Sequence, residues 1–389
     1  VTYLQFSTEK NSKRSAEAMA KLVRAGKCLH HIRWGGVYER SQQRDDMLCC
    51  LLPAIQESIS LKELDICLPP FGGPSNLALE NMLTHTQSLR SLKLIFPDGE
   101  IEDVAVAAVQ GGLKKNTTLR ELTLSFSRRT STVSPIFTTL GDHPLLRRLC
   151  LSGHVMDLTG LEIALQSETS KITELDIHGC YPGPPVIGFQ RLLRALARRP
   201  TLTKLGLRYC RLGIDEARLL QLALCATPIL HTLALERNHL GSAGLAELVP
   251  ALYDNTSIEV LDLSGNNLDD MQSARLLRDI IRRNKTITTL DLSGNSFGRT
   301  IGTVECIADG LSSNSTLLKI NLSDCSLGDG GVSILAQNLA SRAMTLEKVG
   351  LDKNCISSTG VGVIPATREH SSHNINDPGC TGNHNGDTA

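Results

Sequence analysis

The stretch IEVLDLSGNNL, residues 258–268, decides the fold. Leu261 and Leu263 are two residues apart, so on a strand their side chains point to the same face. Asn266 follows three residues later, where we expect the strand to end and the chain to turn. Its side-chain amide can satisfy backbone groups of adjacent repeats. Further copies are LTKLGLRYCRL (202–212), LHTLALERNHL (230–240), ITTLDLSGNSF (287–297) and LLKINLSDCSL (317–327).

The first strand leucine of this pattern, or an apolar substitute, recurs along the whole chain and marks 13 candidate repeats. A period near 28–29 residues leaves room for a helix of about ten residues in each repeat. The marker residues are Leu4, Ile32, Leu64, Leu92, Leu122, Leu149, Leu175, Leu205, Leu233, Leu261, Leu290, Ile320 and Val349.

The segments between the strands have helical periodicity. In residues 242–255 an apolar stripe recurs at i, i+3, i+4 and i+7, and residues 271–284 and 330–339 repeat the design. Pro250 lies inside the first of these segments, so we expect it to bend or shorten that helix. The stripe consists of Leu245, Leu248, Val249 and Leu252.

Together these patterns predict an α/β fold, a right-handed leucine-rich-repeat solenoid. We expect a horseshoe with parallel strands on the concave side, helices on the convex side and about 13 repeats. The solenoid covers residues 1–362, irregular over 1–200 and regular over 201–362. A polar tail, residues 363–389, is expected to be disordered. The chain starts inside a repeat, so we expect it to be part of a longer protein.

The composition excludes several classes of protein. Lys plus Arg and Asp plus Glu both number 40, and aromatic residues make up 3%. A chain without excess positive charge or stacking side chains does not indicate nucleic-acid binding. No apolar run of 18 residues predicts a membrane-spanning helix, and the first residues lack a signal-peptide core. We therefore predict a cytoplasmic protein that binds no membrane.

Several of the 12 cysteines fall into the repeat register. Cys180, Cys210 and Cys325 occupy the turn position that Asn266 holds in its own repeat. Asn and Cys alternate at this position in leucine-rich repeats. We predict reduced, buried thiols, because paired spacings typical of disulfides are absent.

The quoted copies resemble the ribonuclease-inhibitor-like subclass of leucine-rich repeats. This subclass includes ribonuclease inhibitor, the Ran GTPase-activating proteins and the sensor domains of NOD-like receptors. The resemblance implies a curved protein-binding scaffold. It also leaves an alternative open, a GTPase-activating protein of the Ran activator type that binds a small GTPase and catalyses in trans. The acidic tail of those activators is absent here.

Other motifs have a structural interpretation that we favour. Four N-x-[ST] sequons begin at Asn116, Asn255, Asn284 and Asn314, all at one repeat position, where Asn can end a helix in the left-handed conformation. Arginines cluster at residues 191–199 and 275–283, which is typical of the solvated face of a helix. The tail contains His370, His373, Cys380 and His384 without a preorganising element, so we predict no metal site.

No catalytic motif or cofactor-binding loop is present, so we predict that the protein is not an enzyme. Candidate contacts are the residues that alternate with the strand leucines and face outward. Arg and Tyr dominate binding hot spots, which favours Arg208, Tyr209 and Arg237. Our leading hypothesis is a non-enzymatic scaffold or sensor that binds a protein partner, alone or within a larger signalling protein. The predicted partner-binding residues on the concave face are Asp176, His178, Lys204, Arg208, Tyr209, Glu236 and Arg237.

Overall fold

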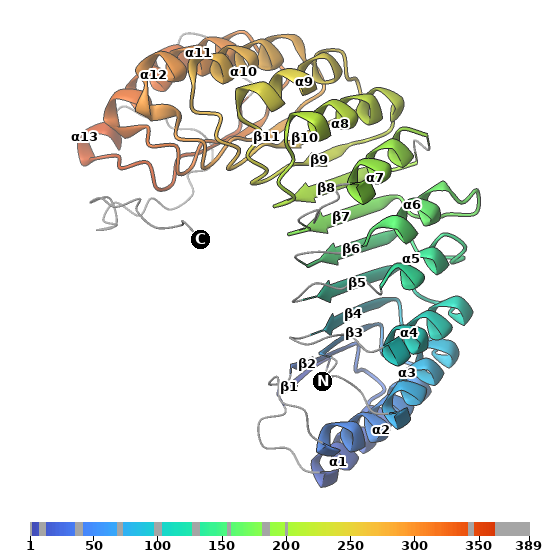
Figure 1. Cartoon of the computed structure of the whole chain (residues 1–389). Coiled ribbons are helices and arrows are strands. Elements are labelled where there is room, and N and C mark those ends of the chain that lie inside the picture. The colour runs from blue at the N-terminus through green and yellow to red at the C-terminus, as the bar shows by residue number, and fades with distance from the viewer. Residues whose placement is uncertain are drawn as a thin grey trace. The chain divides into compact units, whose positions relative to one another are not determined.

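The structure, a computed structural model, describes residues 2–7, 13–35, 42–67, 73–96, 103–126, 133–153, 157–180, 187–198, 201–340 and 346–361. The chain forms two compact units, residues 1–210 and 211–389. In each unit strands alternate with helices, and the helices cover one side of a parallel sheet (Figure 1). The predicted disordered tail lies outside the described residues.

The first unit contains eight of the described strands, which pair in register with their neighbours in chain order. The strands are β1 (Tyr3–Ser7), β2 (His31–Gly35), β3 (Glu63–Cys67), β4 (Ser91–Phe96), β5 (Glu121–Phe126), β6 (Arg148–Ser152), β7 (Glu174–His178) and β8 (Lys204–Arg208). The helices are α1 (Lys13–Ala25), α2 (Gln42–Glu57), α3 (Gly73–His85), α4 (Asp103–Lys115), α5 (Ser134–Leu140), α6 (Thr159–Gln166) and α7 (Ile187–Arg198).

The second unit repeats the arrangement with shorter strands, again parallel and in register. Its strands are β9 (Thr232–Ala234), β10 (Val260–Asp262), β11 (Thr289–Asp291), β12 (Lys319–Asn321) and β13 (Lys348–Gly350). Its helices are α8 (Ile214–Ala226), α9 (Gly241–Tyr253), α10 (Met271–Arg283), the 3-10 turn η1 (Phe297–Arg299), α11 (Ile301–Ser312), α12 (Gly328–Ala340) and α13 (Ser358–Val361).

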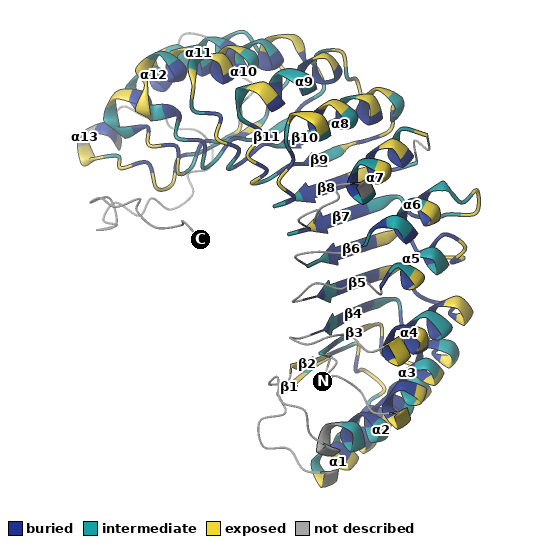
Figure 2. Cartoon of the chain, in the orientation of Figure 1, coloured by how far each residue is buried: buried dark blue, intermediate teal, exposed yellow. Residues whose placement is uncertain are grey.

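All 13 predicted marker residues lie on strands, each as the second residue of its strand. Leu64, Leu149 and Leu261 are fully buried. Trp34, two residues after the marker of β2, is 4% exposed and packs in the core as that phase predicts. Figure 2 shows buried residues along the strands and on the side of the helices that faces them. The repeat period therefore confirms the leucine-rich-repeat solenoid.

Turn asparagines explain why the strands of the second unit are shorter. Asn266 Nδ2 donates to Leu235 O (2.8 Å) in the preceding repeat, and its Oδ1 accepts from Asn238 N (3.0 Å). This amide holds the turn, so the strand ladder ends early. β4 and β5 lack such an asparagine, and their pairing continues to Phe96 and Phe126, whose rings stack at 5.1 Å.

The predicted helices form, with one correction. The stripe of Leu245 and its partners is buried as expected. Pro250, however, does not shorten α9, which continues to Tyr253. Pro53 lies inside α2 at the same repeat position, 11 residues before the next strand leucine. Pro250 is exposed, and on a solvated helix face water can satisfy the carbonyl that proline leaves without a donor.

The four sequon asparagines cap the ends of helices, but not by the mechanism that we predicted. None of them has a positive φ. Asn284 has φ −68°, its Oδ1 accepts from Thr286 N (2.9 Å) and Ile287 N (2.8 Å), and its Nδ2 donates to Leu252 O (2.9 Å). The amide itself connects consecutive repeats, so a left-handed backbone is not needed. Asn116 makes the same contacts and is 1% exposed.

The cysteines in the turn register are buried, as predicted, and none of the described cysteines forms a disulfide. Cys210 Sγ donates to Ile177 O (3.6 Å) and Arg208 O (3.2 Å), and so takes the place of an asparagine amide. Burial raises the pKa of Cys210 to about 12 and that of Cys325 to about 11. None of the helices within the described residues is long and apolar enough to cross a membrane.

Candidate functional site

We call the side of each sheet away from the helices the strand face. It consists of the residues that alternate with the buried leucines and of the turn residues that contact them, such as Tyr209 beside His178 and Arg237 beside Glu236. Five of the seven predicted contact residues belong to the first unit: Asp176, His178, Lys204, Arg208 and Tyr209. The other two, Glu236 and Arg237, belong to the second unit. Each group is described within its own unit.

An ion pair joins two of these predicted residues on β7 and β8. Nη1 of Arg208 donates to Oδ2 of Asp176, and both side chains are about one-third exposed. Oδ1 of Asp176 is shielded from solvent and has no hydrogen-bond partner among the described residues. The pair therefore presents a guanidinium that is already oriented, next to a carboxylate with unused acceptor capacity.

Gly206 makes room for this ion pair, and the sequence interpretation missed it. A methyl group at Gly206 would lie 2.5 Å from Oδ1 of Asp176 and 3.1 Å from Nη1 of Arg208. In each of the strands β1 to β7, the residue that follows the marker residue has a side chain. The absence of a side chain between two charged residues on adjacent strands was the signal in the sequence.

Two rings lie at the carboxyl ends of the same strands. The ring centroids of His178 and Tyr209 are 4.9 Å apart and the planes are tilted by 50°. Tyr209 adopts a left-handed backbone with φ 53°. The equivalent turn position is also left-handed at Arg237, Gly265, Gly294, Asp324 and Lys353, so this conformation belongs to the turn of the repeat.

Lys204 belongs to a looser group of charges at the amino ends of the strands. Glu174 Oε2 lies 3.8 Å from Lys204 Nζ and 3.9 Å from Arg148 Nε. These separations exceed hydrogen-bond length, and the three side chains are one-third to one-half exposed. Exposed pairs of this kind contribute little to stability, so their partners can be exchanged at small cost.

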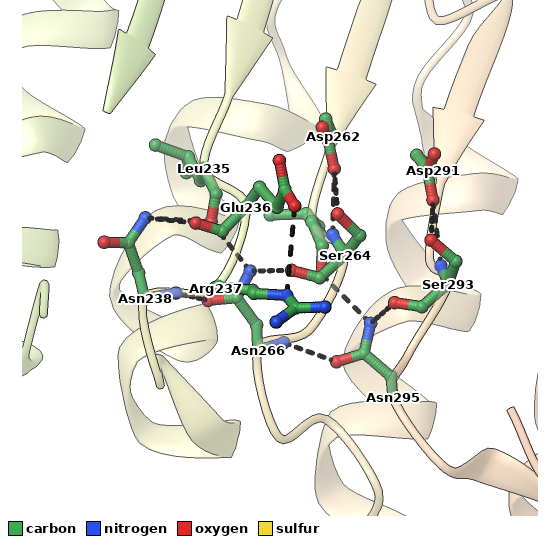
Figure 3. Close-up of polar contacts among 11 residues, drawn as sticks. Leu235, Glu236, Arg237, Asn238, Asp262, Ser264, Asn266, Asp291, Ser293 and Asn295 are labelled. Atoms are coloured by element: carbon green, nitrogen blue, oxygen red, sulfur yellow. Dashed lines mark hydrogen bonds and ion pairs between the residues drawn. The ribbon is translucent and has the colours of Figure 1, made fainter. Parts of the chain in front are cut away.

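In the second unit, Glu236 and Arg237 lie in the turn after β9, separated from the strand by Leu235, and contact each other (Figure 3). Nε of Arg237 is 3.9 Å from Oε1 of Glu236, and the backbone N–H of Arg237 donates to Ser264 O (2.8 Å). Arg237 has φ 52°, while Gly265 and Gly294 occupy the same position in the next two repeats. A methyl group at Gly265 would lie 2.7 Å from Cγ of Arg237, so the arginine stem packs over that glycine.

Asp262 and Asp291 on β10 and β11 make their hydrogen bonds mainly within their own turns. Oδ1 of Asp262 accepts from N (3.0 Å) and Oγ (2.6 Å) of Ser264, and Asp291 contacts Ser293 in the same way (Figure 3). Only Asp291 also bonds across repeats, since its Oδ2 accepts from Nδ2 of Asn321 (2.9 Å).

The arginine clusters on the helices are engaged in local contacts. Arg191 pairs with Glu162 (3.6 Å), and Arg282 pairs with Asp309 (3.3 Å). The guanidinium of Arg283 lies 4.7 Å from the ring centroid of Tyr253. These contacts fit the solvated helix face that the sequence predicted.

No group of three or more potential ligands within the described residues could hold a metal ion. The histidines and the cysteine of the tail lie outside those residues, so the structure does not describe that part of the prediction. The strand face offers oriented cations, carboxylates and rings, which is chemistry for recognition by charge and shape.

Comparison with known proteins identifies the repeats. A family model described as leucine-rich repeat matches residues 254–270, 283–302 and 313–336. NACHT, LRR and PYD domains-containing protein 5 of Bos taurus is 30% identical over 235 residues, which are 58% of this chain and 21% of that protein. Ribonuclease inhibitor of Sus scrofa is 27% identical over 260 residues, which cover 59% of this chain and 56% of the inhibitor.

The chain spans about a fifth of the length of the first of these relatives. Among solved structures, the crystal structure of the Rad7 and Elc1 complex in yeast aligns with a TM-score of 0.52 at 14% identity. The alignment covers 91% of this chain and 80% of that chain. At that identity the similarity concerns the fold alone.

Proposed function

We propose that this leucine-rich-repeat protein, similar to the ribonuclease-inhibitor-like subclass, is a non-enzymatic scaffold or sensor that binds a protein partner through its strand face. The observation that carries this proposal is the Asp176–Arg208 pair, held over the gap at Gly206. An arginine that is fixed before binding loses less conformational entropy when a partner docks.

The strand face also offers rings beside these charges. The ring centroids of His178 and Tyr209 lie 4.9 Å apart at the carboxyl ends of β7 and β8, and Tyr and Arg are enriched in binding hot spots. The name of one relative, ribonuclease inhibitor, describes a protein that acts on another protein, which fits a protein partner here.

The expected cytoplasmic location is part of the same proposal. Buried thiols with raised pKa values, such as those of Cys210 and Cys325, suit a reducing compartment. We expect such a sensor to work within a larger signalling protein. The relative from Bos taurus, whose name lists NACHT and PYD domains beside the repeats, fits a multidomain setting.

Affinity capture with charge-reversed variants tests the proposal. Arg208→Glu and Arg237→Glu are compared with Arg194→Glu, which reverses an exposed arginine on α7 in the same chain. Bound proteins are quantified by mass spectrometry. We expect the strand-face variants to lose at least 90% of a specific partner and the α7 variant to retain it. Equal retention by all three variants would exclude the strand face as the binding surface.

A further inference from the structure

Basic side chains stand directly before four consecutive strands of the first unit. Lys62, Arg90, Arg120 and Arg147 precede β3, β4, β5 and β6, each two residues before the strand leucine. We call these four residues the basic row. They occupy another repeat position than the predicted contact residues, and the sequence interpretation did not single them out.

Backbone hydrogen bonds align the basic row. Arg90 N donates to Lys62 O, Arg120 N to Arg90 O and Arg147 N to Arg120 O, each at 2.8 Å. The four residues are therefore in register in four consecutive repeats. With strands about 4.8 Å apart, the row extends over about 14 Å.

The basic row is accessible and has no acidic partner. Lys62, Arg120 and Arg147 are exposed, and none of the four forms an ion pair with a described residue. Arg90 is half-buried, and its Nη1 donates to the carbonyls of Leu89 (3.2 Å) and Thr118 (3.4 Å). A carbonyl contact leaves the positive charge of the guanidinium uncompensated.

Two glutamates that adjoin the row in sequence contact other residues. Glu63 follows Lys62, and its Oε2 lies 3.2 Å from Nδ1 of His31. Glu121 follows Arg120, and its Oε2 accepts from Oγ of Ser91 (3.5 Å). Like charges on neighbouring strands repel each other, so an aligned row without counter-charges favours the binding of an anion.

We propose that the basic row binds an acidic segment of a partner polypeptide. In an extended chain, alternate side chains are about 6.8 Å apart, so three acidic residues on one face span about 14 Å, which matches the row. No aromatic residue occupies the row to stack a base, which favours a polypeptide over a nucleic acid. This surface is independent of the strand-face proposal.

Fluorescence anisotropy with a labelled decaglutamate peptide tests the proposal, with a decathymidylate oligonucleotide as the alternative anion. The variant carries Lys62→Gln, Arg120→Gln and Arg147→Gln, and leaves the half-buried Arg90 in place. The matched control carries Lys21→Gln, Arg194→Gln and Arg198→Gln, three exposed positions on α1 and α7. Both variants lose three positive charges, and circular dichroism verifies their folding.

We expect the row variant to bind decaglutamate at least tenfold more weakly, and the control to bind within twofold of the unchanged chain. Affinity should also fall as NaCl rises from 50 to 300 mM, in proportion to the number of contacts. Equal losses in both variants would indicate a net-charge effect and overturn the proposal. Tighter binding of decathymidylate through the same residues would overturn it in favour of a nucleic acid. Neither result bears on Arg208 and Arg237, whose own variants test the strand face.

Discussion

We predict that His143 makes the stability of the first unit depend on pH. His143 occupies the repeat position of the capping asparagines. Its Nδ1 accepts hydrogen bonds from Leu145 N (3.3 Å) and Leu146 N (3.1 Å). In the same way, Oδ1 of Asn284 accepts from two backbone amides. The residue is 2% exposed, and its Nε2 has no partner among the described residues. Burial lowers the pKa of His143 from 6.5 to about 4.

The depressed pKa fixes the direction of the effect. Between pH 6.5 and pH 4 the unfolded chain takes up a proton that the folded chain does not, so stability is complete above this window and decreases within it. With these two pKa values, linkage gives a loss of about 2 kcal/mol between pH 8 and pH 5. Protonation of Nδ1 would also remove the acceptor for both amides.

The assay is urea unfolding of the unchanged chain and of His143→Asn at pH 8 and pH 5, followed by hydrogen exchange at Leu145 and Leu146. Asparagine restores the cap of the other repeats and does not titrate. We expect the two proteins to differ by less than about 1 kcal/mol at pH 8, and the variant to be about 2 kcal/mol more stable than the unchanged chain at pH 5. The same loss of stability in both proteins would refute the assignment of the effect to His143.

Three further predictions concern the turns and the cysteines. In urea unfolding, Asn266→Ala should lower the unfolding free energy of the second unit by about 3 kcal/mol, because it leaves buried backbone groups unpaired. Asn266→Cys should lower it less than Asn266→Ala, because Cys325 makes equivalent contacts with Leu292 O (3.4 Å) and Ser323 O (3.5 Å). Arg237→Gly should change the unfolding free energy by less than about 0.5 kcal/mol relative to the unchanged chain, because relief of left-handed strain offsets the larger conformational entropy that glycine loses on folding. Capture of the partner should fall in this variant. A large loss of stability would show that the arginine is structural. In a thiol titration with a disulfide reagent at pH 8, the exposed thiols of Cys28, Cys225 and Cys355 should react before the protein unfolds. The buried thiols of Cys180, Cys210 and Cys325 should react only after unfolding, and their rapid reaction in the folded protein would contradict their burial.

Leucine periodicity was sufficient to predict every strand, because each repeat must bury its marker against the neighbouring repeats. The same holds for the apolar stripe of α9 and for the bonds of Asn266 to adjacent repeats. These features depend on sequence distance within one repeat and on the identity of one residue. Such information is present in the sequence.

Features that depend on three-dimensional register could not be predicted in the same way. The Asp176–Arg208 pair occupies the space left by the missing side chain of Gly206, which lies opposite Asp176 on β8. The left-handed backbone of Tyr209 follows from the turn geometry, which a tyrosine in the sequence does not indicate. At the sequon asparagines the error was one of mechanism, since an amide that bonds the backbone directly removes the need for a left-handed residue.

Site-specific photo-crosslinking tests most directly whether a partner docks on the strand face. A benzophenone amino acid is placed at Lys204 on β8, or at Arg194 on α7 as the helix-face control, and the same two variants are also made with Arg208→Glu. The proposed function predicts a covalent adduct with one partner from position 204, its loss when Arg208 is reversed, and no such adduct from position 194. An adduct that forms only from position 194, or that persists from position 204 after the reversal of Arg208, would contradict it.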